Sequence, residues 1–250
     1  MQATGLISFA IFIWATGRWP DLEPGMVPFA LVLGVLGVIS VAALYRGLAL
    51  GPVAVVAPVV ASYVVVTVIL VVIFLGERLS GPQVGAASLV FAGVVLTSTD
   101  ARLLRVTLGR PVPGVRIGLV ATLGFGMWSA VFAVATRQYS WIPMILLLRA
   151  TSFVFIGSFI ASRRIDLRVF RERTALVLGT IVGVLDTLAN ALFALGIGSG
   201  YASLAATGTG MYPIVPAILG MVTLGERLAP NQYVGIAVLV VGLAALGAVS

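Results

Sequence analysis

The segment LGERL occupies Leu75 to Leu79, and the same five letters recur from Leu224 to Leu228. Each copy directly follows a long apolar run. A glutamate beside an arginine is unusual in this chain, because only 9% of its 250 residues are charged. A motif that ends an apolar run twice, 149 positions apart, indicates that one structural unit occurs twice.

The composition predicts an all-α polytopic membrane protein. Hydrophobic residues make up 60% of the chain, whereas soluble domains carry about 25% charged residues. Apolar runs of about 20 residues cross a bilayer, and these runs are continuous rather than alternating as in a barrel. We expect nine transmembrane helices, near residues 4–19, 26–48, 52–75, 82–99, 115–137, 142–162, 174–197, 202–224 and 231–249.

Two absences restrict the chemistry that the chain can perform. It contains no cysteine and no histidine, which removes disulfides, thiol chemistry and imidazole acid–base catalysis. We therefore expect no cofactor and no metal. The net charge of +7 comes from arginines in short loops, which is typical of membrane orientation and not of a nucleic-acid-binding groove.

The two halves of the chain match beyond the LGERL motif. The matching positions are Ala3-Thr4 and Ala150-Thr151, Ala43–Tyr45 and Ala191–Phe193, Tyr63 and Tyr212, Gln83 and Gln232, and Gly93 and Gly242. Five predicted spans separate one LGERL from the next, and an odd number reverses the direction of the chain. The two units are therefore inverted relative to each other, as in many secondary transporters.

These features together resemble the EamA domain of the drug/metabolite transporter superfamily. The resemblance rests on a helix with Tyr or Phe, a proline-bearing helix that ends in GERL, and a QxxG segment before a glycine-rich helix. It implies five helices per repeat and a small metabolite as substrate, commonly exported. The second repeat, 115–249, has five predicted helices, whereas the first, 1–99, has four and lacks its first helix.

Two departures from the family pattern follow. We expect the first helix of the first repeat either to precede residue 1 or to be missing in a natural nine-span variant. The family usually has a proline 13 residues before the motif glutamate. Pro213 keeps this spacing to Glu226, but Val64 occupies the equivalent position before Glu77. The sequence therefore favours a helix break in the second repeat over one in the first.

Asp186 is the strongest candidate for a functional residue. It lies at the centre of the seventh predicted span, with Asn190 one turn later on the same helix face. An ionisable group at the centre of a bilayer costs about 2.5 kcal/mol or more, so it is usually functional or paired. One interpretation is a substrate or proton site. The alternative is a structural pair with Arg149 of the preceding span, and both roles are compatible.

Further pathway candidates lie in the spans that carry proline, where freed backbone carbonyls need a partner or a wet cavity. These candidates are Tyr63, Tyr201, Thr207, Thr209, Tyr212 and Pro213, together with Trp128 in the fifth span. Ordinary hydrogen bonding between helices is the alternative for the threonines, and apolar packing is the alternative for Trp128. We expect the motif residues Gly76, Glu77, Arg78, Gly225, Glu226 and Arg227 to stabilise helix ends.

The sequence therefore predicts a multi-pass permease of the cell membrane that exports a small metabolite or amino-acid-like solute by alternating access. Its expected partners are the solute, protons as a coupling ion, and the lipid bilayer. Nucleic acid is not expected, and an oligomer remains open. The alternative is a non-transporting or flippase-type subunit of a homo- or hetero-oligomer. A membrane-embedded enzyme is disfavoured, because no nucleophile–base pair or metal cluster is visible.

The arginine distribution predicts the topology. In the nine-span arrangement one face receives eleven arginines, and the other receives only Arg18, Arg78 and Arg137. The positive-inside rule places the arginine-rich loops 100–114 and 163–173 in the cytoplasm. Cysteines introduced by Thr107→Cys or Asp166→Cys should then resist an impermeant thiol reagent in intact cells, whereas Asp21→Cys should react. Labelling of both loops from outside would contradict this orientation.

Overall fold

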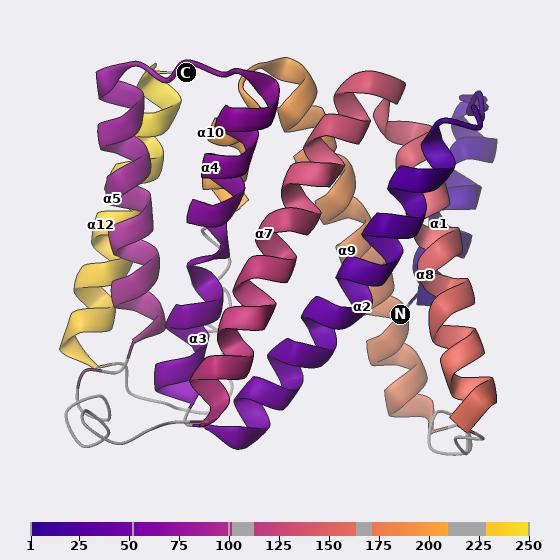
Figure 1. The fold of residues 1–250 in the computed structure, drawn as a ribbon, viewed down its shortest axis with the longest axis horizontal. Helices are drawn as coiled ribbons and strands as arrows, with labels where there is room; N and C mark the ends of the chain where they lie inside the picture. The colour runs from indigo at the N-terminus through magenta and orange to yellow at the C-terminus, as the bar shows by residue number, and fades with distance from the viewer. Residues whose placement is uncertain are drawn as a thin grey trace. The chain divides into compact units, whose positions relative to one another are not determined.

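The computed structural model describes residues 2–51, 53–99, 101, 113–163, 172–209 and 229–249. These residues are almost entirely helical, and no strand occurs among them. The helices, labelled in Figure 1, are α1 (Gln2–Thr16), α2 (Met26–Leu50), α3 (Val53–Ala61), α4 (Tyr63–Leu75), α5 (Gly81–Ser98), α7 (Pro113–Tyr139), α8 (Trp141–Arg163), α9 (Arg173–Ser199), α10 (Ala202–Gly208) and α12 (Pro230–Val249).

The prediction of an all-helical polytopic membrane protein is confirmed. Apolar segments adopt helices in a bilayer because every backbone polar group must then be satisfied within the segment. By length and composition, seven helical segments in the described part of the chain could cross a membrane: Met26–Leu50, Val55–Leu75, Gly81–Ser98, Gly114–Tyr139, Trp141–Ser162, Arg173–Gly198 and Pro230–Val249.

The count of nine spans remains a prediction. Helix α1 has 15 residues and ends at Thr16, so it is shorter than the predicted segment 4–19. Helix α10 has seven residues and covers only the start of the predicted segment 202–224. Most of that segment lies outside the described residues.

The helices divide into two compact units, and the division passes through α2 and α7. One unit comprises Met1–Val38 and Val131–Ser199, and the other comprises Ile39–Ala130 and Gly200–Ser250. The first unit therefore contains α1, α8, α9 and parts of α2 and α7. The second contains α3, α4, α5, α10, α12 and the remaining parts of α2 and α7.

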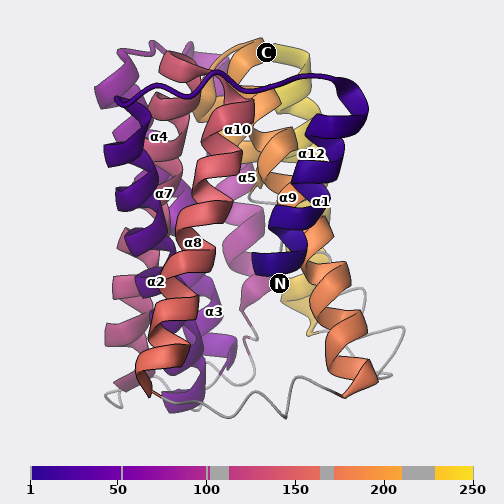
Figure 2. The same ribbon diagram turned by 90° about the vertical axis from the view of Figure 1, so that its right-hand side faces the viewer.

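In the first unit, α1 packs against both α8 and α9 (Figure 2). Two threonines make equivalent hydrogen bonds between helices. The Thr4 hydroxyl donates to the Gly179 carbonyl oxygen at 3.1 Å, and the Thr151 hydroxyl donates to the Ala30 carbonyl oxygen at 3.1 Å. The first bond joins α1 to α9 and the second joins α8 to α2. The internal match of Ala3-Thr4 with Ala150-Thr151 makes α1 and α8 equivalent. Each of these two helices therefore makes the same type of bond to another helix of the unit.

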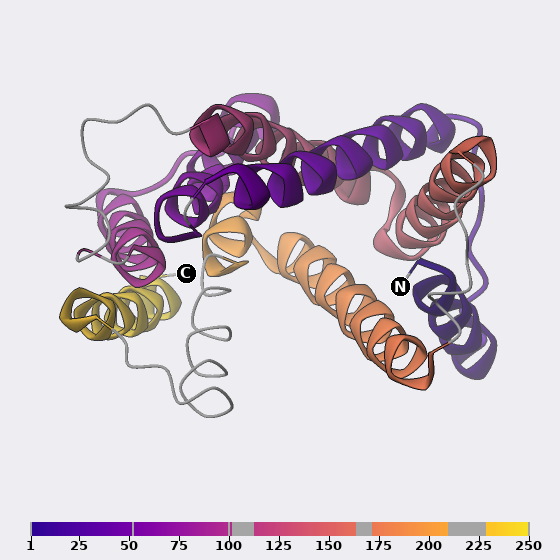
Figure 3. The ribbon, with the colours of Figure 1, turned by 90° about the horizontal axis from the view of Figure 1, so that it is seen from below.

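In the second unit, α5 and α12 lie side by side and antiparallel (Figures 1 and 3). The Gln83 side chain at the start of α5 donates to the Val249 carbonyl oxygen at the end of α12, at 3.1 Å. The Gln232 side chain at the start of α12 donates to the Thr97 carbonyl oxygen near the end of α5, also at 3.1 Å. The helix pair is therefore joined at both ends by the same type of bond.

The crossing of α5 and α12 depends on glycine. A Cβ atom on Gly93 would lie 2.5 Å from the backbone nitrogen of Leu239, and one on Gly242 would lie 2.7 Å from that of Val90. Small residues allow such close approach of helices in membranes. Gly93 precedes Gly242 by 149 positions, and Val90 precedes Leu239 by the same number. This is also the separation of the two LGERL copies. The two helices thus make reciprocal contacts about one crossing point.

The predicted segment 52–75 is interrupted at Ser62, whereas the proline spacing favoured a break in the second repeat, where the equivalent segment lies outside the described residues. Helix α3 ends at Ala61 and α4 begins at Tyr63. Pro58 within α3 has no backbone N–H, which removes one helical bond. The Ser62 hydroxyl donates to the Val59 carbonyl oxygen at 2.5 Å and competes with the helical ladder. A proline at Val64 is therefore not needed for a break.

The glycine crossing gives a matched pair of substitutions on α5. Gly93→Ala would force α5 and α12 apart, and we expect a loss of roughly 1–3 kcal/mol of unfolding free energy. Gly85→Ala on the same helix meets no atom within 4 Å, so its stability should equal that of the wild type or exceed it. Unfolding in mixed detergent–SDS micelles, followed by circular dichroism, measures both. Equal stability of the two variants would contradict the tight crossing.

Candidate functional site

The residues of the first LGERL motif form the junction between α4 and α5. Gly76 follows α4 with φ of 64°, in the left-handed region that glycine adopts without strain. Glu77 is buried after this turn, whereas Arg78 is exposed. Leu79 packs against the core cluster of Ala86, Leu204 and Leu246. The motif therefore ends one helix and directs two side chains inward.

Glu77 caps the N-terminus of α10. Its carboxylate accepts hydrogen bonds from the backbone N–H of Ala202 at 2.7 Å, the backbone N–H of Ser203 at 3.0 Å and the Ser203 hydroxyl at 2.5 Å. Unpaired N–H groups and the helix dipole make this end of a helix attractive to a negative charge. The motif thus fixes the beginning of a helix that lies 125 residues later in the chain.

The start of α5 is also capped. Ser80 and Gln83 form a reciprocal capping box, in which the Ser80 backbone N–H donates to Gln83 Oε1 at 2.9 Å. The start of α12 has part of the same arrangement, because the Ala229 backbone N–H donates to Gln232 Oε1 at 2.8 Å. The second copy of the motif, with Gly225, Glu226 and Arg227, lies outside the described residues.

The structure brings Arg149 and Asp186 together in the first unit. Nη1 of Arg149 on α8 lies 2.5 Å from Oδ2 of Asp186 on α9, and the same nitrogen donates to Oε1 of Gln2 on α1 at 3.2 Å. Three helices therefore contribute to one polar cluster. Asn190 joins it through its side chain, which donates to the Asp186 backbone carbonyl oxygen at 2.8 Å.

The two charges of this pair have very different surroundings. The Arg149 side chain is 3% exposed, whereas the Asp186 side chain is 40% exposed. Removing a guanidinium from water is costly unless it is paired and hydrogen-bonded. Asp186 therefore neutralises a deeply buried cation while keeping part of its own surface open.

Gln2 was not predicted as a site residue. The internal match places Gln2 opposite Arg149 in equivalent helices. Gln2 and Arg149 are both polar residues in otherwise apolar segments, and this shared polarity was the signal that could have identified Gln2 as a site residue. The close contact became visible only once α1 was seen to pack on α8.

The remaining described candidates lie in the second unit. The Tyr63 hydroxyl is 3.3 Å from the Thr209 hydroxyl, and the Tyr63 ring packs against Phe125 at 5.9 Å between centroids. The first contact joins α4 to the segment after α10, and the second joins α4 to α7. Trp128 on α7 is half-buried. Tyr212 and Pro213 lie outside the described residues.

Two other candidates have local roles in α10. The buried Thr207 hydroxyl donates to the Ser203 carbonyl oxygen at 2.8 Å, four residues earlier in the same helix. Tyr201 precedes α10 at the N-cap position, and its side chain makes no capping bond and is 41% exposed. The Thr207 bond is therefore the ordinary structural type that the sequence left as an alternative, while Tyr201 remains open to contact.

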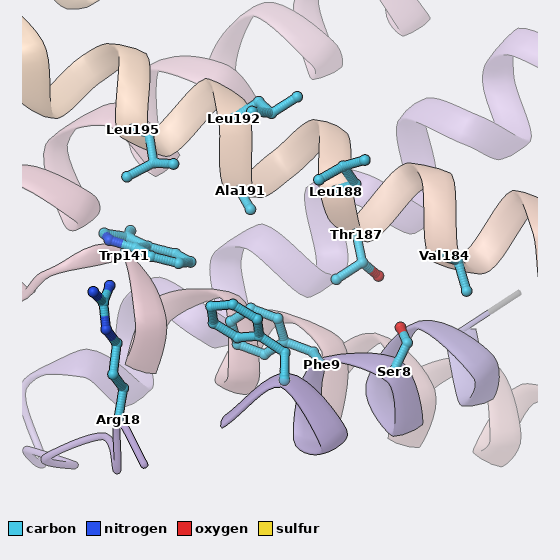
Figure 4. Close-up of a pocket in the computed structure, with 11 residues that line it drawn as sticks. Ser8, Phe9, Arg18, Trp141, Val184, Thr187, Leu188, Ala191, Leu192 and Leu195 are labelled. Carbon is cyan, nitrogen blue, oxygen red and sulfur yellow. The ribbon is translucent and has the colours of Figure 1, made fainter. Parts of the chain in front are cut away.

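An apolar pocket of about 340 Å³ lies between α1 and α9 in the first unit (Figure 4). One wall comes from α1 and the other from the face of α9 that carries Val184, Leu188 and Leu192. Trp141 and Arg18 lie toward one end, with the Arg18 guanidinium directed toward the indole. Single apolar residues in an apolar chain carry no sequence signal, so the sequence did not predict this pocket.

The fold and the polar cluster define a polytopic helical membrane protein with a buried charge pair. The model of the EamA-like transporter family matches residues 2–99. The resemblance to this family that the sequence indicated is therefore confirmed over these residues.

Comparison with solved structures found a chain with a fold similar to that of this protein. One crystal structure matches with a TM-score of 0.72 and 19% identity, over 98% of this chain and 83% of the other. At this identity the match concerns the fold alone. The comparison with curated proteins found no match.

The cap on α10 can be tested through stability. Glu77→Ala leaves the N–H groups of Ala202 and Ser203 without their acceptor in a buried setting, which should cost about 1–3 kcal/mol. Glu77→Gln retains one acceptor oxygen and should cost less. The control is Glu23→Ala, at an exposed position between α1 and α2. Chemical unfolding in detergent micelles compares the three, and a Glu77→Ala variant as stable as the control would contradict the capping role.

Proposed function

We propose that the protein is a secondary transporter that exports a small metabolite or amino-acid-like solute. The match to the EamA-like transporter family supports membrane transport as the general activity. In this proposal the chain acts by alternating access in the cell membrane, without enzymatic chemistry. Protons are the coupling ion, and an oligomeric assembly is compatible with the mechanism.

The proposed mechanism uses residues 1–99 and 115–249 as two inverted repeats. The reciprocal contacts of α5 with α12, and of Thr4 and Thr151, support this division. In inverted-repeat transporters one repeat rocks against the other around a site near the bilayer midplane. The glycine crossing of α5 with α12 and the Glu77 cap on α10 are contacts between these two repeats.

The buried pair of Arg149 and Asp186 is the observation that carries the proposed site. Charged side chains within membrane-spanning helices usually face a pathway or pair with each other. Here one partner is fully buried and the other is partly open. We infer that Asp186 exchanges its contact with Arg149 for a proton or a positively charged group of the solute during transport.

Reconstituted vesicles test this function. Wild-type protein should exchange solutes from a mixture of radiolabelled amino acids, with a rate that depends on the pH gradient. Asp186→Asn should abolish the exchange, because the exchangeable carboxylate is lost. Removing one partner of a buried pair also costs about 3–5 kcal/mol. The double variant Arg149→Gln/Asp186→Asn should regain that stability and still fail to transport.

The outcomes separate the competing roles. Recovery of transport in the double variant would show that Asp186 only neutralises Arg149. Absence of any solute exchange by the wild type, with scrambling of a fluorescent lipid in the same vesicles, would favour the flippase-type alternative. Absence of both activities would favour a non-transporting subunit.

A further inference from the structure

Arg149 uses only one of its three guanidinium nitrogens in the described structure. Nη1 holds both Gln2 and Asp186. Nε and Nη2 are buried and have no hydrogen-bond partner among the described residues. Buried polar atoms are nearly always hydrogen-bonded, so each exception requires an explanation. Here two adjacent exceptions belong to one charged group whose side chain is 3% exposed.

The two unpartnered nitrogens form one edge of the guanidinium plane. The Nε–H and one N–H of Nη2 point in parallel along this edge, a fixed fork that matches the two oxygens of a carboxylate. Asp186 approaches through Nη1, so the two donors of this edge are buried without a partner among the described residues. A single water would satisfy such a pair of donors less well than a bidentate anion.

We propose that the Nε/Nη2 edge of Arg149 binds the carboxylate group of the transported solute. This inference rests on the proposed transport function and names the substrate class as carboxylate-bearing small molecules. Asp186 then sets the net charge of the site, since a second carboxylate on Arg149 gives the cluster one excess negative charge. A solute with an amino group beside its carboxylate brings the charge that offsets this excess.

Helix α1 lies close to both Arg149 and the apolar pocket of the first unit. A Cβ on Gly5 of α1 would lie 3.5 Å from Cδ of Arg149 and 2.8 Å from Oγ1 of Thr187. Helix α1 therefore covers the stem of Arg149 closely. Thr187 also lines the apolar pocket between α1 and α9, so an apolar side chain of a bound solute has a suitable space on the same unit.

Arg149→Lys tests the fork without removing the charge. Lysine keeps a cation for Asp186 but has one ammonium group and no parallel pair of donors. The matched control is Arg173→Lys, at an exposed position at the start of α9. Three probes share one side chain: leucine has both charged groups, isocaproate has only the carboxylate, and leucinamide has only the amine.

Binding to purified protein in micelles is read as a ligand-dependent rise in melting temperature. Leucine and isocaproate should stabilise the wild type and Arg173→Lys, and leucinamide should not. Arg149→Lys should bind the carboxylates at least about tenfold more weakly, because two charge-assisted hydrogen bonds are lost. Tighter binding of leucine than of isocaproate would identify a zwitterion as the solute, and equal binding would identify a simple anion.

A measurement on the wild type keeps the test decisive if Arg149→Lys does not fold. Isocaproate should shift the nitrogen-15 NMR signal of the Arg149 Nε–H, assigned by its loss in Arg149→Gln/Asp186→Asn, and leucinamide should not. Equal carboxylate binding by Arg149→Lys, an unchanged signal, or no carboxylate-dependent stabilisation of the wild type would each overturn the inference. Carboxylate binding in micelles without exchange in vesicles would overturn the transport proposal alone.

Discussion

The buried carboxylate of Glu77 sets the arrangement of the second unit. It ends the turn after α4 and satisfies three donors at the start of α10. A helix end within an apolar protein has no water to satisfy its N–H groups, so a side chain must do so. Because Ala202 follows Glu77 by 125 residues, this contact joins segments from both halves of the sequence. A short helix such as α10, with seven residues, depends strongly on such a cap.

The first unit is organised by a different constraint, the burial of Arg149. Its position inside α8 would be unfavourable without Asp186 on α9 and Gln2 on α1. The pair therefore selects which helices can be neighbours. The Glu77 carboxylate accepts from two backbone N–H groups and one hydroxyl, whereas Nε and Nη2 of Arg149 have no partner among the described residues. For that reason the proposed solute site is at Arg149 and not at Glu77.

Much of the fold followed from the sequence, because bilayer spans are long apolar runs that composition reveals directly. The pairing of Arg149 with Asp186 was one of the two interpretations that the sequence allowed, since a charge in an apolar helix requires a partner. The break at Ser62 was not foreseen. It depends on the competition of one hydroxyl with the helical ladder, and serine occurs in many unbroken membrane helices.

The sequence by itself determined the helical class, the resemblance of residues 2–99 to a transporter family and the repetition of a motif, because these depend on local composition and on matching letters. Only the tertiary structure decided what Glu77 contacts, that Gln2 joins the charged cluster, and that Nε and Nη2 of Arg149 remain without a partner among the described residues. These features depend on the direction of side chains across helix interfaces. Residues 147 positions apart in the chain leave no local signal of such contacts.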